Sequence, residues 1–229
     1  FHHALHFVTH VRADHNWLIY LLPVGGLLTI GLYQILGITR NRGTNEIIDA
    51  ILTGGDVSAY VSPTIILAST VTHLFGGSAG REGAALQIGG SMASKMGNWL
   101  GLKDHNRTIL VSCGMSAVFA GLFGTPLTAT IFCMEFVSVG TLFTPTLLPC
   151  YLSAFFASRV SGALGVHAET YLLETAAALN LANVGGAIVL AMLVSVIGVM
   201  MCFVFHKAEH LAAHYLPNRW LRIALGGAV

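Results

Sequence analysis

The sequence predicts an all-α, polytopic membrane protein with broken and re-entrant helices. Hydrophobic residues make up 55% of its 229 residues and charged residues only 9%, whereas about 25% of an average soluble protein is charged. The mean hydropathy is +0.74. Several apolar segments are shorter than the roughly 20 residues that a membrane crossing needs, and glycine or proline interrupts them. A soluble domain of this size would have too few charged side chains to cover its surface.

The first part of the chain predicts one crossing and two amphipathic segments. Residues 1–14 are amphipathic and rich in histidine. Residues 17–36 are apolar and long enough to cross once, and Pro23 within them predicts a kink. After a basic break at 40–42, residues 43–53 predict an amphipathic helix that is too short to span a bilayer.

The middle of the chain predicts short apolar helices around one unusual helix. Residues 62–80 are apolar and end in a glycine-rich run. Residues 82–100 have a helical pattern, but half of their positions are polar or small, which is typical of a helix buried in protein or lining a cavity. A polar loop is expected at 103–107, followed by two short apolar helices at 109–123 and 127–137.

The last part of the chain contains the clearest membrane crossing, at 184–205. An apolar helix is expected at 147–164, a polar stretch at 165–183 and an amphipathic, basic segment at 206–222. Because the sequence begins and ends within such patterns, we expect it to be a fragment of a longer protein.

Composition and spacing exclude several classes of function. A net charge of +1 gives no electrostatic basis for binding nucleic acid. The four cysteines are widely spaced in apolar runs, so neither a metal site built from cysteines nor a disulfide framework is expected. The glycine-rich run is not followed by the G-K-[ST] of a phosphate-binding loop. Residues 76–80 (GGSAG) have the spacing G-x-S-x-G, but no strand precedes them, whereas the serine elbow of a hydrolase lies between a strand and a helix. We therefore expect neither an enzyme nor a cofactor.

The strongest site candidate is Glu82, within Gly80-Arg81-Glu82-Gly83. A charge inside a membrane costs at least a few kcal/mol, so an intramembrane carboxylate indicates function. The flanking glycines leave backbone N–H groups uncovered, and such groups bind anions at the starts of helices. Broken helices in transporters direct these positive ends at their substrates, so the segment predicts an anion site. A structural ion pair between Arg81 and Glu82 is the alternative.

Four short motifs follow one another along the chain: residues 80–90 (GREGAALQIGG), 114–117 (GMSA), 123–127 (FGTPL) and 132–135 (FCME). In their order and spacing, the chain resembles the CLC family of chloride channels and proton-coupled halide antiporters, from about residue 17 to its end. Ala84 stands where the family motif has proline.

The resemblance implies that Glu82 is the gate of an anion pore. Its carboxylate would occupy the external anion site when ionised and leave it when protonated or displaced. Backbone N–H groups around Gly83, Ala84 and Ala85 would hold the permeant halide without a metal. Gly80 and Arg81 complete the binding segment that the family motif implies.

A second anion-binding segment departs from the chloride-transporting pattern. The family's G-S-G-I-P motif supplies a serine, but this sequence reads Gly43-Thr44-Asn45-Glu46-Ile47, closer to the fluoride-exporting branch. The resemblance assigns anion contacts to Gly43, Thr44 and Asn45. Arg42 either raises halide affinity or is an arginine of a cytoplasmic loop.

A further departure concerns proton coupling. Chloride/proton antiporters of the family have two adjacent glutamates here, and the second accepts the internal proton. This chain has Glu135 followed by Phe136, and a phenyl ring cannot relay a proton. Glu135 is expected to be structural, at a helix end near a subunit interface. The protein would then be a passive channel or would move protons by another route.

The resemblance also implies the architecture and its setting. We expect residues 1–183 to be the first half of an inverted repeat and residues 184–229 the start of the second. Family members are homodimers with one pore per subunit. The expected partners are chloride or fluoride, protons and the lipid bilayer, and the expected location is the bacterial inner membrane.

Three functional hypotheses remain open from the sequence. The first is chloride conduction gated by Glu82, and the second is proton-coupled fluoride export. A remote third is a zinc transporter, because histidines recur every four residues near both ends of the chain and would align on helix faces. His73, within the apolar segment before Glu82, either tunes the protonation of Glu82 or is a satisfied core histidine. The histidines of the repeats are His2, His6 and His10, and His206, His210 and His214.

Overall fold

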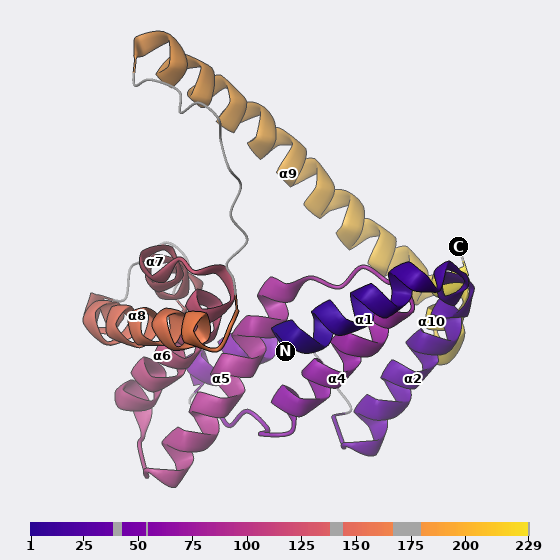
Figure 1. The fold of residues 1–229 in the computed structure, drawn as a ribbon, viewed down its shortest axis with the longest axis horizontal. Coiled ribbons are helices and arrows are strands. Elements are labelled where there is room, and N and C mark those ends of the chain that lie inside the picture. The colour runs from indigo at the N-terminus through magenta and orange to yellow at the C-terminus, as the bar shows by residue number, and fades with distance from the viewer. Residues whose placement is uncertain (39–42, 54, 138–143, 167–179, 229) are drawn as a thin grey trace. The chain divides into compact units, whose positions relative to one another are not determined.

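The computed structural model describes residues 1–38, 43–53, 55–137, 144–166 and 180–228 (Figure 1). In these ranges the regular structure is helical throughout, which confirms the predicted all-α class. The chain divides into two compact units, Phe1–Glu169 and Thr170–Gly227.

The first unit contains eight α-helices and two 3-10 turns in its described residues. Their bounds are α1 His2–Asp14, η1 Asn16–Leu21, α2 Leu22–Ile35, α3 Thr44–Thr53, α4 Val61–Leu74, α5 Arg81–Trp99, α6 Asp104–Phe123, α7 Pro126–Val137, η2 Thr144–Thr146 and α8 Leu147–Ala163. The described part of the second unit consists of α9 Leu181–Tyr215 and α10 Arg219–Ala228.

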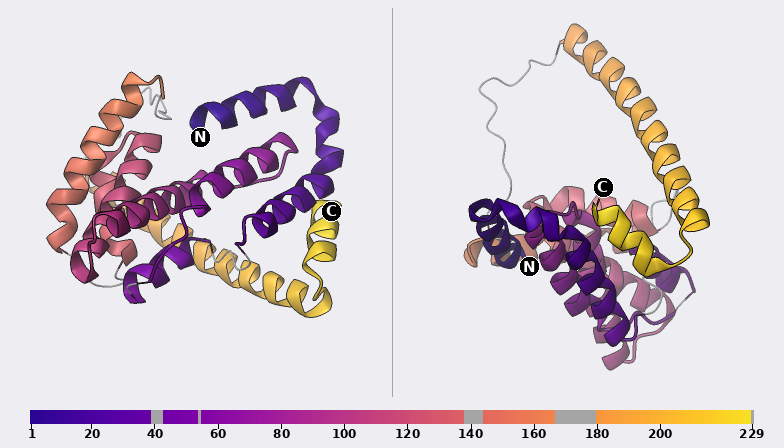
Figure 2. Two further views of the ribbon diagram at one scale, coloured as in Figure 1. Left: turned by 90° about the horizontal axis from the view of Figure 1, so that it is seen from below. Right: turned by 90° about the vertical axis from the view of Figure 1, so that its right-hand side faces the viewer.

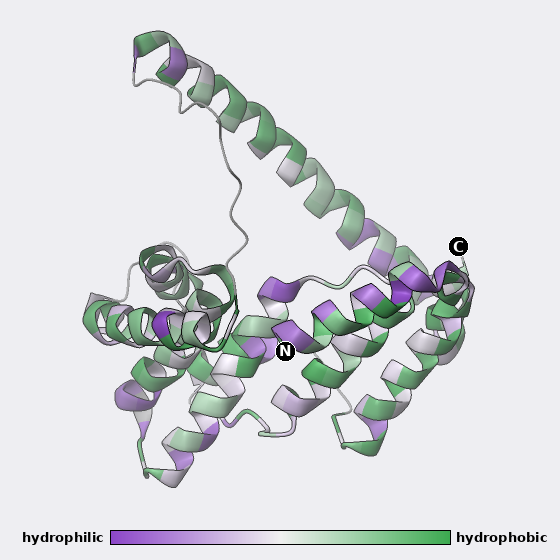
Figure 3. Ribbon diagram, viewed as in Figure 1, coloured by the Kyte–Doolittle hydropathy of each residue, from purple (hydrophilic) through white to green (hydrophobic). Residues whose placement is uncertain are grey.

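Helices of very different length support the prediction of broken membrane helices. Within the residues that the structure describes, three segments are long and apolar enough to cross a bilayer, Asn16–Ile35, His105–Phe123 and Leu181–Tyr215. α4 has only 14 residues, about 21 Å at 1.5 Å per residue, which falls short of a hydrocarbon core of about 30 Å. Figure 3 shows α9 with polar patches near its amino end, a long apolar middle and further polar patches toward its carboxyl end.

α5 is buried in protein, as its mixed composition predicts, and it packs closely against α6. A Cβ atom on Gly89 would clash with the backbone carbonyl of Gly114, and one on Gly114 would lie 2.5 Å from the Cβ of Ala93. Such small residues allow two helix backbones to approach each other in a membrane protein. The further views in Figure 2 show the helices of this unit from two other directions.

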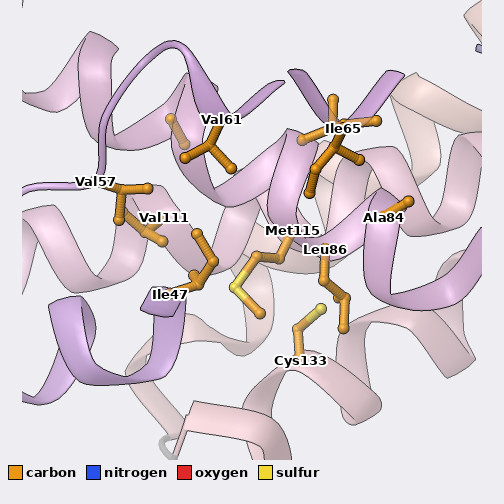
Figure 4. Packing of buried hydrophobic residues seen from close by; sticks show 11 residues of the cluster. Ile47, Val57, Val61, Ile65, Ala84, Leu86, Val111, Met115 and Cys133 are labelled. Atoms are coloured by element: carbon orange, nitrogen blue, oxygen red, sulfur yellow. The ribbon is translucent and has the colours of Figure 1, made fainter. Parts of the chain in front are cut away.

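The apolar core joins the helices around α5. Ile47 of α3 and Met115 of α6 are fully buried, and they pack with Ile65 of α4, Leu86 of α5 and Cys133 of α7 (Figure 4). Five helices therefore share one cluster. This cluster fixes α3 against α5, and so positions the starts of both helices.

The structure corrects two local predictions. The expected loop at 103–107 is wrong from Asp104 onward, because α6 begins there after the extended Lys103. The segment expected to begin at residue 206 is instead the continuation of α9 to Tyr215.

Pro23 lies in the first turn of α2, where its missing N–H costs nothing, directly after the 3-10 helix η1. The kink predicted within this segment stays a prediction.

Candidate anion site

The first turn of α5 offers uncapped backbone donors. Gly80 is its extended N-cap residue (φ −66°, ψ 141°) and no side chain caps the turn. The first N–H groups of a helix have no partner within it, and they lie at the positive end of the helix dipole. Arg81 and Gly83 are half-buried, whereas Ala84 and Ala85 are buried. The start of α5 therefore has the backbone geometry that the predicted anion site requires.

The carboxylate of Glu82 lies over this same turn. Its Oε2 is 3.0 Å from the position that a Cβ on Gly80 would take, so the side chain folds back toward the N-cap residue. Glu82 itself is exposed. A negative group here interacts favourably with the helix dipole, and it occupies space next to the N–H groups that would receive a free anion.

The start of α3 meets the start of α5. Thr44, the first residue of α3, has its Cγ2 3.5 Å from the position of a Cβ on Gly83. Further along, a Cβ on Gly90 would lie 2.7 Å from Ile47, so the two helices stay in contact. Gly43 has φ +62°, a left-handed conformation that favours glycine. Two positive helix ends that are far apart in sequence are thus brought together.

Among the other predicted anion contacts of the second segment, Thr44 is half-buried and Asn45 is exposed. Gly43 is half-buried beside the side chain of Gln87. Arg42 lies outside the described residues, so its two sequence interpretations stay open.

Gln87 is the polar residue that the sequence prediction did not assign to the site. It is 8% exposed, and its Oε1 has no hydrogen-bond partner in the part of the chain that the structure describes. Its Nε2 lies 4.0 Å from the position of a Cβ on Gly43. A polar residue within the buried run of α5 was the signal that could have identified it.

Phe136 stands at the position where chloride/proton antiporters of the family have the glutamate that accepts the internal proton. It is half-buried against the core cluster, and its ring centroid lies 5.6 Å from that of Phe132. Phe119 also stacks on Phe132, with their ring centroids 5.1 Å apart. The surroundings of Phe136 are aromatic, and its own ring has no titratable atom. Glu135, two residues before the end of α7, is exposed.

His73 is held within its own helix. Its Nδ1 donates to the carbonyl of Ser69 at 2.7 Å, the arrangement of a satisfied histidine. No three His, Cys, Asp or Glu side chains among the described residues approach one another closely enough to hold a metal ion. The zinc hypothesis therefore gains no support from the geometry.

A polar contact ties α5 and α6 to the segment between α3 and α4. The guanidinium of Arg107 donates to the carboxylate of Asp56 and, at 2.9 Å, to the hydroxyl of Ser94. Hydrogen bonds from Asn98 and then Arg107 lower the pKa of Asp56 below its ordinary value. This contact lies far along α5 from the anion site, and we assign it a structural role.

Comparison with known proteins places this geometry in context. Residues 25–229 match the family of voltage gated chloride channels. A chloride/fluoride channel protein of Pseudomonas syringae pv. tomato is 31% identical over 225 residues, which are 98% of this chain and 50% of that protein. The voltage-gated ClC-type chloride channel ClcB of Shigella flexneri is 27% identical over 161 residues, 69% of this chain and 38% of that protein.

The similarity extends to three dimensions. The crystal structure of a CLC-type fluoride/proton antiporter superposes with a TM-score of 0.91 at 32% identity, covering 98% of this chain and 57% of the other. The chain spans half or less of the length of the two curated relatives named above. The family match includes both helix starts of the candidate site. The chain belongs to the voltage gated chloride channel (CLC) family.

Proposed function

We propose that the full-length protein moves halide anions across a bacterial inner membrane through a pore gated by Glu82. The family comprises channels and transporters rather than enzymes. The observation that carries the proposal is the carboxylate of Glu82, folded back over the uncapped start of α5. A carboxylate is itself an anion, so it competes with a halide for the same N–H groups.

The gate works by protonation or displacement. When ionised, the Glu82 carboxylate is held at the positive helix end and blocks the site. A proton removes its charge and this attraction, after which a halide takes its place. An incoming halide displaces it in the same way. Because one position alternates between carboxylate and halide, the movements of protons and halides are linked.

Fluoride, exchanged for protons, is the cargo that the observations support better. The sequence is 32% identical to a CLC-type fluoride/proton antiporter and 31% identical to a chloride/fluoride channel protein. Its identity to a chloride channel is lower, at 27%. The start of α3, Gly43-Thr44-Asn45, also departs from the serine-containing chloride motif. Phe136 cannot carry a proton, so protons pass by way of Glu82 and a route that avoids this ring.

Chloride conduction is the second candidate. It is supported by the chloride channels among the relatives and by the absence of a titratable group at position 136. In that case the phenyl ring is the reason that coupling to protons is lost. In either case we expect a homodimer with one pore in each subunit.

The test is ion flux from liposomes that contain the full-length protein, with fluoride and chloride measured separately and external pH recorded. Fluoride efflux with opposing proton movement supports the exchanger. Chloride efflux without proton movement supports the channel. If neither halide leaves the liposomes faster than from protein-free controls, the proposed function is wrong.

A further inference from the structure

The packing of α6 against α8 brings together two cysteines that the proposed anion site does not use. Cys113 lies in the middle of α6 and Cys150 in the first turn of α8. The thiol of Cys150 donates a hydrogen bond to the sulfur of Cys113, with the two Sγ atoms 3.8 Å apart. Both are free thiols. Because they are 37 positions apart in the chain, no spacing motif predicts this contact.

Reciprocal hydrogen bonds between the two helices hold the cysteines opposite each other. The hydroxyl of Ser153 on α8 donates to the carbonyl of Cys113 at 3.0 Å. The hydroxyl of Ser116 on α6 donates to the carbonyl of Cys150 at 3.3 Å. The backbone of each cysteine is thus tied to a side chain of the opposite helix. The contact between the sulfurs therefore rests on a fixed helix pair, not on two mobile side chains alone.

The two cysteines are not equivalent. Cys150 is fully buried, whereas Cys113 is half-buried. Since Cys150 donates its S–H, the sulfur of Cys113 is the acceptor, and such a donor stabilises negative charge on it. The thiolate is the reactive form of cysteine, so Cys113 is the sulfur expected to react first. A reactive, accessible cysteine next to a second thiol is typical of a redox-sensitive pair.

Simple packing accounts less well for this pair than for Cys133 of α7. A buried cysteine usually acts as a small apolar side chain, and Cys133 does so, since it is fully buried in the apolar cluster around α5. The sulfurs of Cys113 and Cys150 face each other instead. They have to approach by roughly 1.8 Å to reach the bond length of a disulfide, about 2.05 Å.

We propose that Cys113 and Cys150 form an oxidisable thiol pair, which hydrogen peroxide or another small hydroperoxide converts to a disulfide between α6 and α8. Cys113 is the sulfur that the oxidant attacks first, and Cys150 is the resolving thiol. The inference goes beyond the proposed halide transport and does not depend on it.

The chemistry takes two steps. The Cys113 thiolate attacks one oxygen of the peroxide, the O–O bond breaks, and the leaving hydroxide takes up the thiol proton to form water. Cys113 is then a sulfenic acid. The sulfur of Cys150 attacks that sulfur, the S–S bond forms, the S–O bond breaks, and the hydroxyl leaves with the Cys150 proton as a second water. Two thiols are oxidised and one peroxide is reduced.

The experiment uses the full-length protein in detergent, first reduced and then treated with graded hydrogen peroxide. Remaining thiols are alkylated with N-ethylmaleimide under denaturing conditions, and mass spectrometry of the peptides identifies the linked cysteines. Dimedone, which labels sulfenic acids, is added in parallel. The variants are Cys113→Ser and Cys150→Ser. Cys202→Ser removes an exposed thiol of α9 and is the matched control.

We expect peroxide to remove the thiols of Cys113 and Cys150 together and to produce the peptide that links them. The thermal midpoint should rise by a few degrees, because the crosslink restricts the unfolded chain, and a thiol reductant should reverse both changes. In Cys150→Ser, Cys113 should react with dimedone. In Cys113→Ser, Cys150 should stay reduced, and Cys202→Ser should form the same link as the wild type.

The inference is overturned if Cys113 and Cys150 both remain free at peroxide concentrations that oxidise Cys202. It is also overturned if Cys113 is found linked to a cysteine other than Cys150. Dimedone labelling of Cys150 in Cys113→Ser, without labelling of Cys113 in Cys150→Ser, contradicts the assigned order of attack. If a serine variant does not fold, the peptide map of the wild type decides whether the pair exists.

Discussion

Gly80 keeps open the space into which the Glu82 carboxylate folds. A Cβ at this position would lie 3.0 Å from Oε2 of Glu82, close enough to push a flexible carboxylate aside without disturbing the backbone. The residue is extended with φ −66°, which alanine adopts freely. The start of α5 should therefore tolerate alanine at position 80, whereas the proposed gating by Glu82 should not.

We expect Gly80→Ala to fold normally and to raise halide efflux at neutral pH roughly tenfold, the equivalent of ~1.4 kcal/mol, because the carboxylate is displaced from the helix start. The rate of halide efflux from liposomes is measured for this variant and for the wild type. The matched control is the double variant with Glu82→Gln, in which Gly80→Ala should add nothing further. Equal increments in both backgrounds would show that Gly80 does not act through Glu82.

Asp56 provides a pH-dependent contribution to stability. Hydrogen bonds from Asn98 and then Arg107 lower its pKa in the folded protein. A group with a lowered folded pKa stabilises the protein above its unfolded pKa of about 3.9, and this contribution is lost as pH falls through the folded value. The effect is small because the side chain of Asp56 is largely exposed.

Asp56→Asn should therefore lower the thermal midpoint slightly between about pH 5 and 7. The difference from wild type should begin to shrink below about pH 4 and be lost once pH falls below the lowered pKa of Asp56 in the folded protein. The thermal midpoint of each protein is measured at each pH by intrinsic tryptophan fluorescence during heating. A difference that is the same at every pH would mean that the charge of Asp56 is irrelevant to the contact.

Among the helices, the crossing of α5 and α6 depends most on small residues. A Cβ on Gly89 would meet the backbone of Gly114, which cannot move aside as a side chain can. Overpacking of this kind costs about 1–3 kcal/mol. By contrast, Gly162 of α8 has open space around its Cβ position, where alanine favours a helix by roughly 0.5–1 kcal/mol.

We expect Gly89→Ala to lower the thermal midpoint of the detergent-solubilised protein and Gly162→Ala to leave it unchanged or raise it. Each is a glycine-to-alanine change within a helix, so they differ only in the space available. If the two variants melted alike, the close approach of α5 and α6 would not contribute to stability.

The sequence predicts the helices well where their patterns are strong. Gly80-Arg81-Glu82-Gly83 locates the start of α5 to within one residue, and the apolar runs locate α4, α7 and α8. The start of α6 was missed because its first residues are polar, and polar residues are typical of loops as well as of exposed helix ends. The extent of α9 was underestimated for the same reason at its carboxyl end.

The unpaired state of Gln87 could not be predicted in this way. It depends on the contact of α3 with α5, which joins residues that are distant in the chain and is fixed by Ile47 against Gly90. Periodicity shows which face of a helix is buried but does not show which polar atoms on that face find partners. The roles of Glu82 and of the two helix starts came from motif resemblance and stay predictions.

At the scale of the whole molecule, this chain contributes two helix starts to a proposed ion path. The chain spans half or less of the length of the curated relatives compared here, so the activity belongs to the full-length protein. The inverted-repeat halves expected at 1–183 and 184–229 also stay a prediction. What the first unit contains by itself is an uncapped, positively polarised site with a carboxylate folded over it.

The most direct test of the gate is the pH dependence of fluoride efflux in the wild type and in Glu82→Gln, both as full-length protein in liposomes. We expect efflux from the wild type to rise as pH falls, because protons release the carboxylate from the helix start. The glutamine variant has no charge to titrate, so its efflux should be independent of pH. The same pH dependence in both proteins would contradict the assignment of Glu82 as the gate.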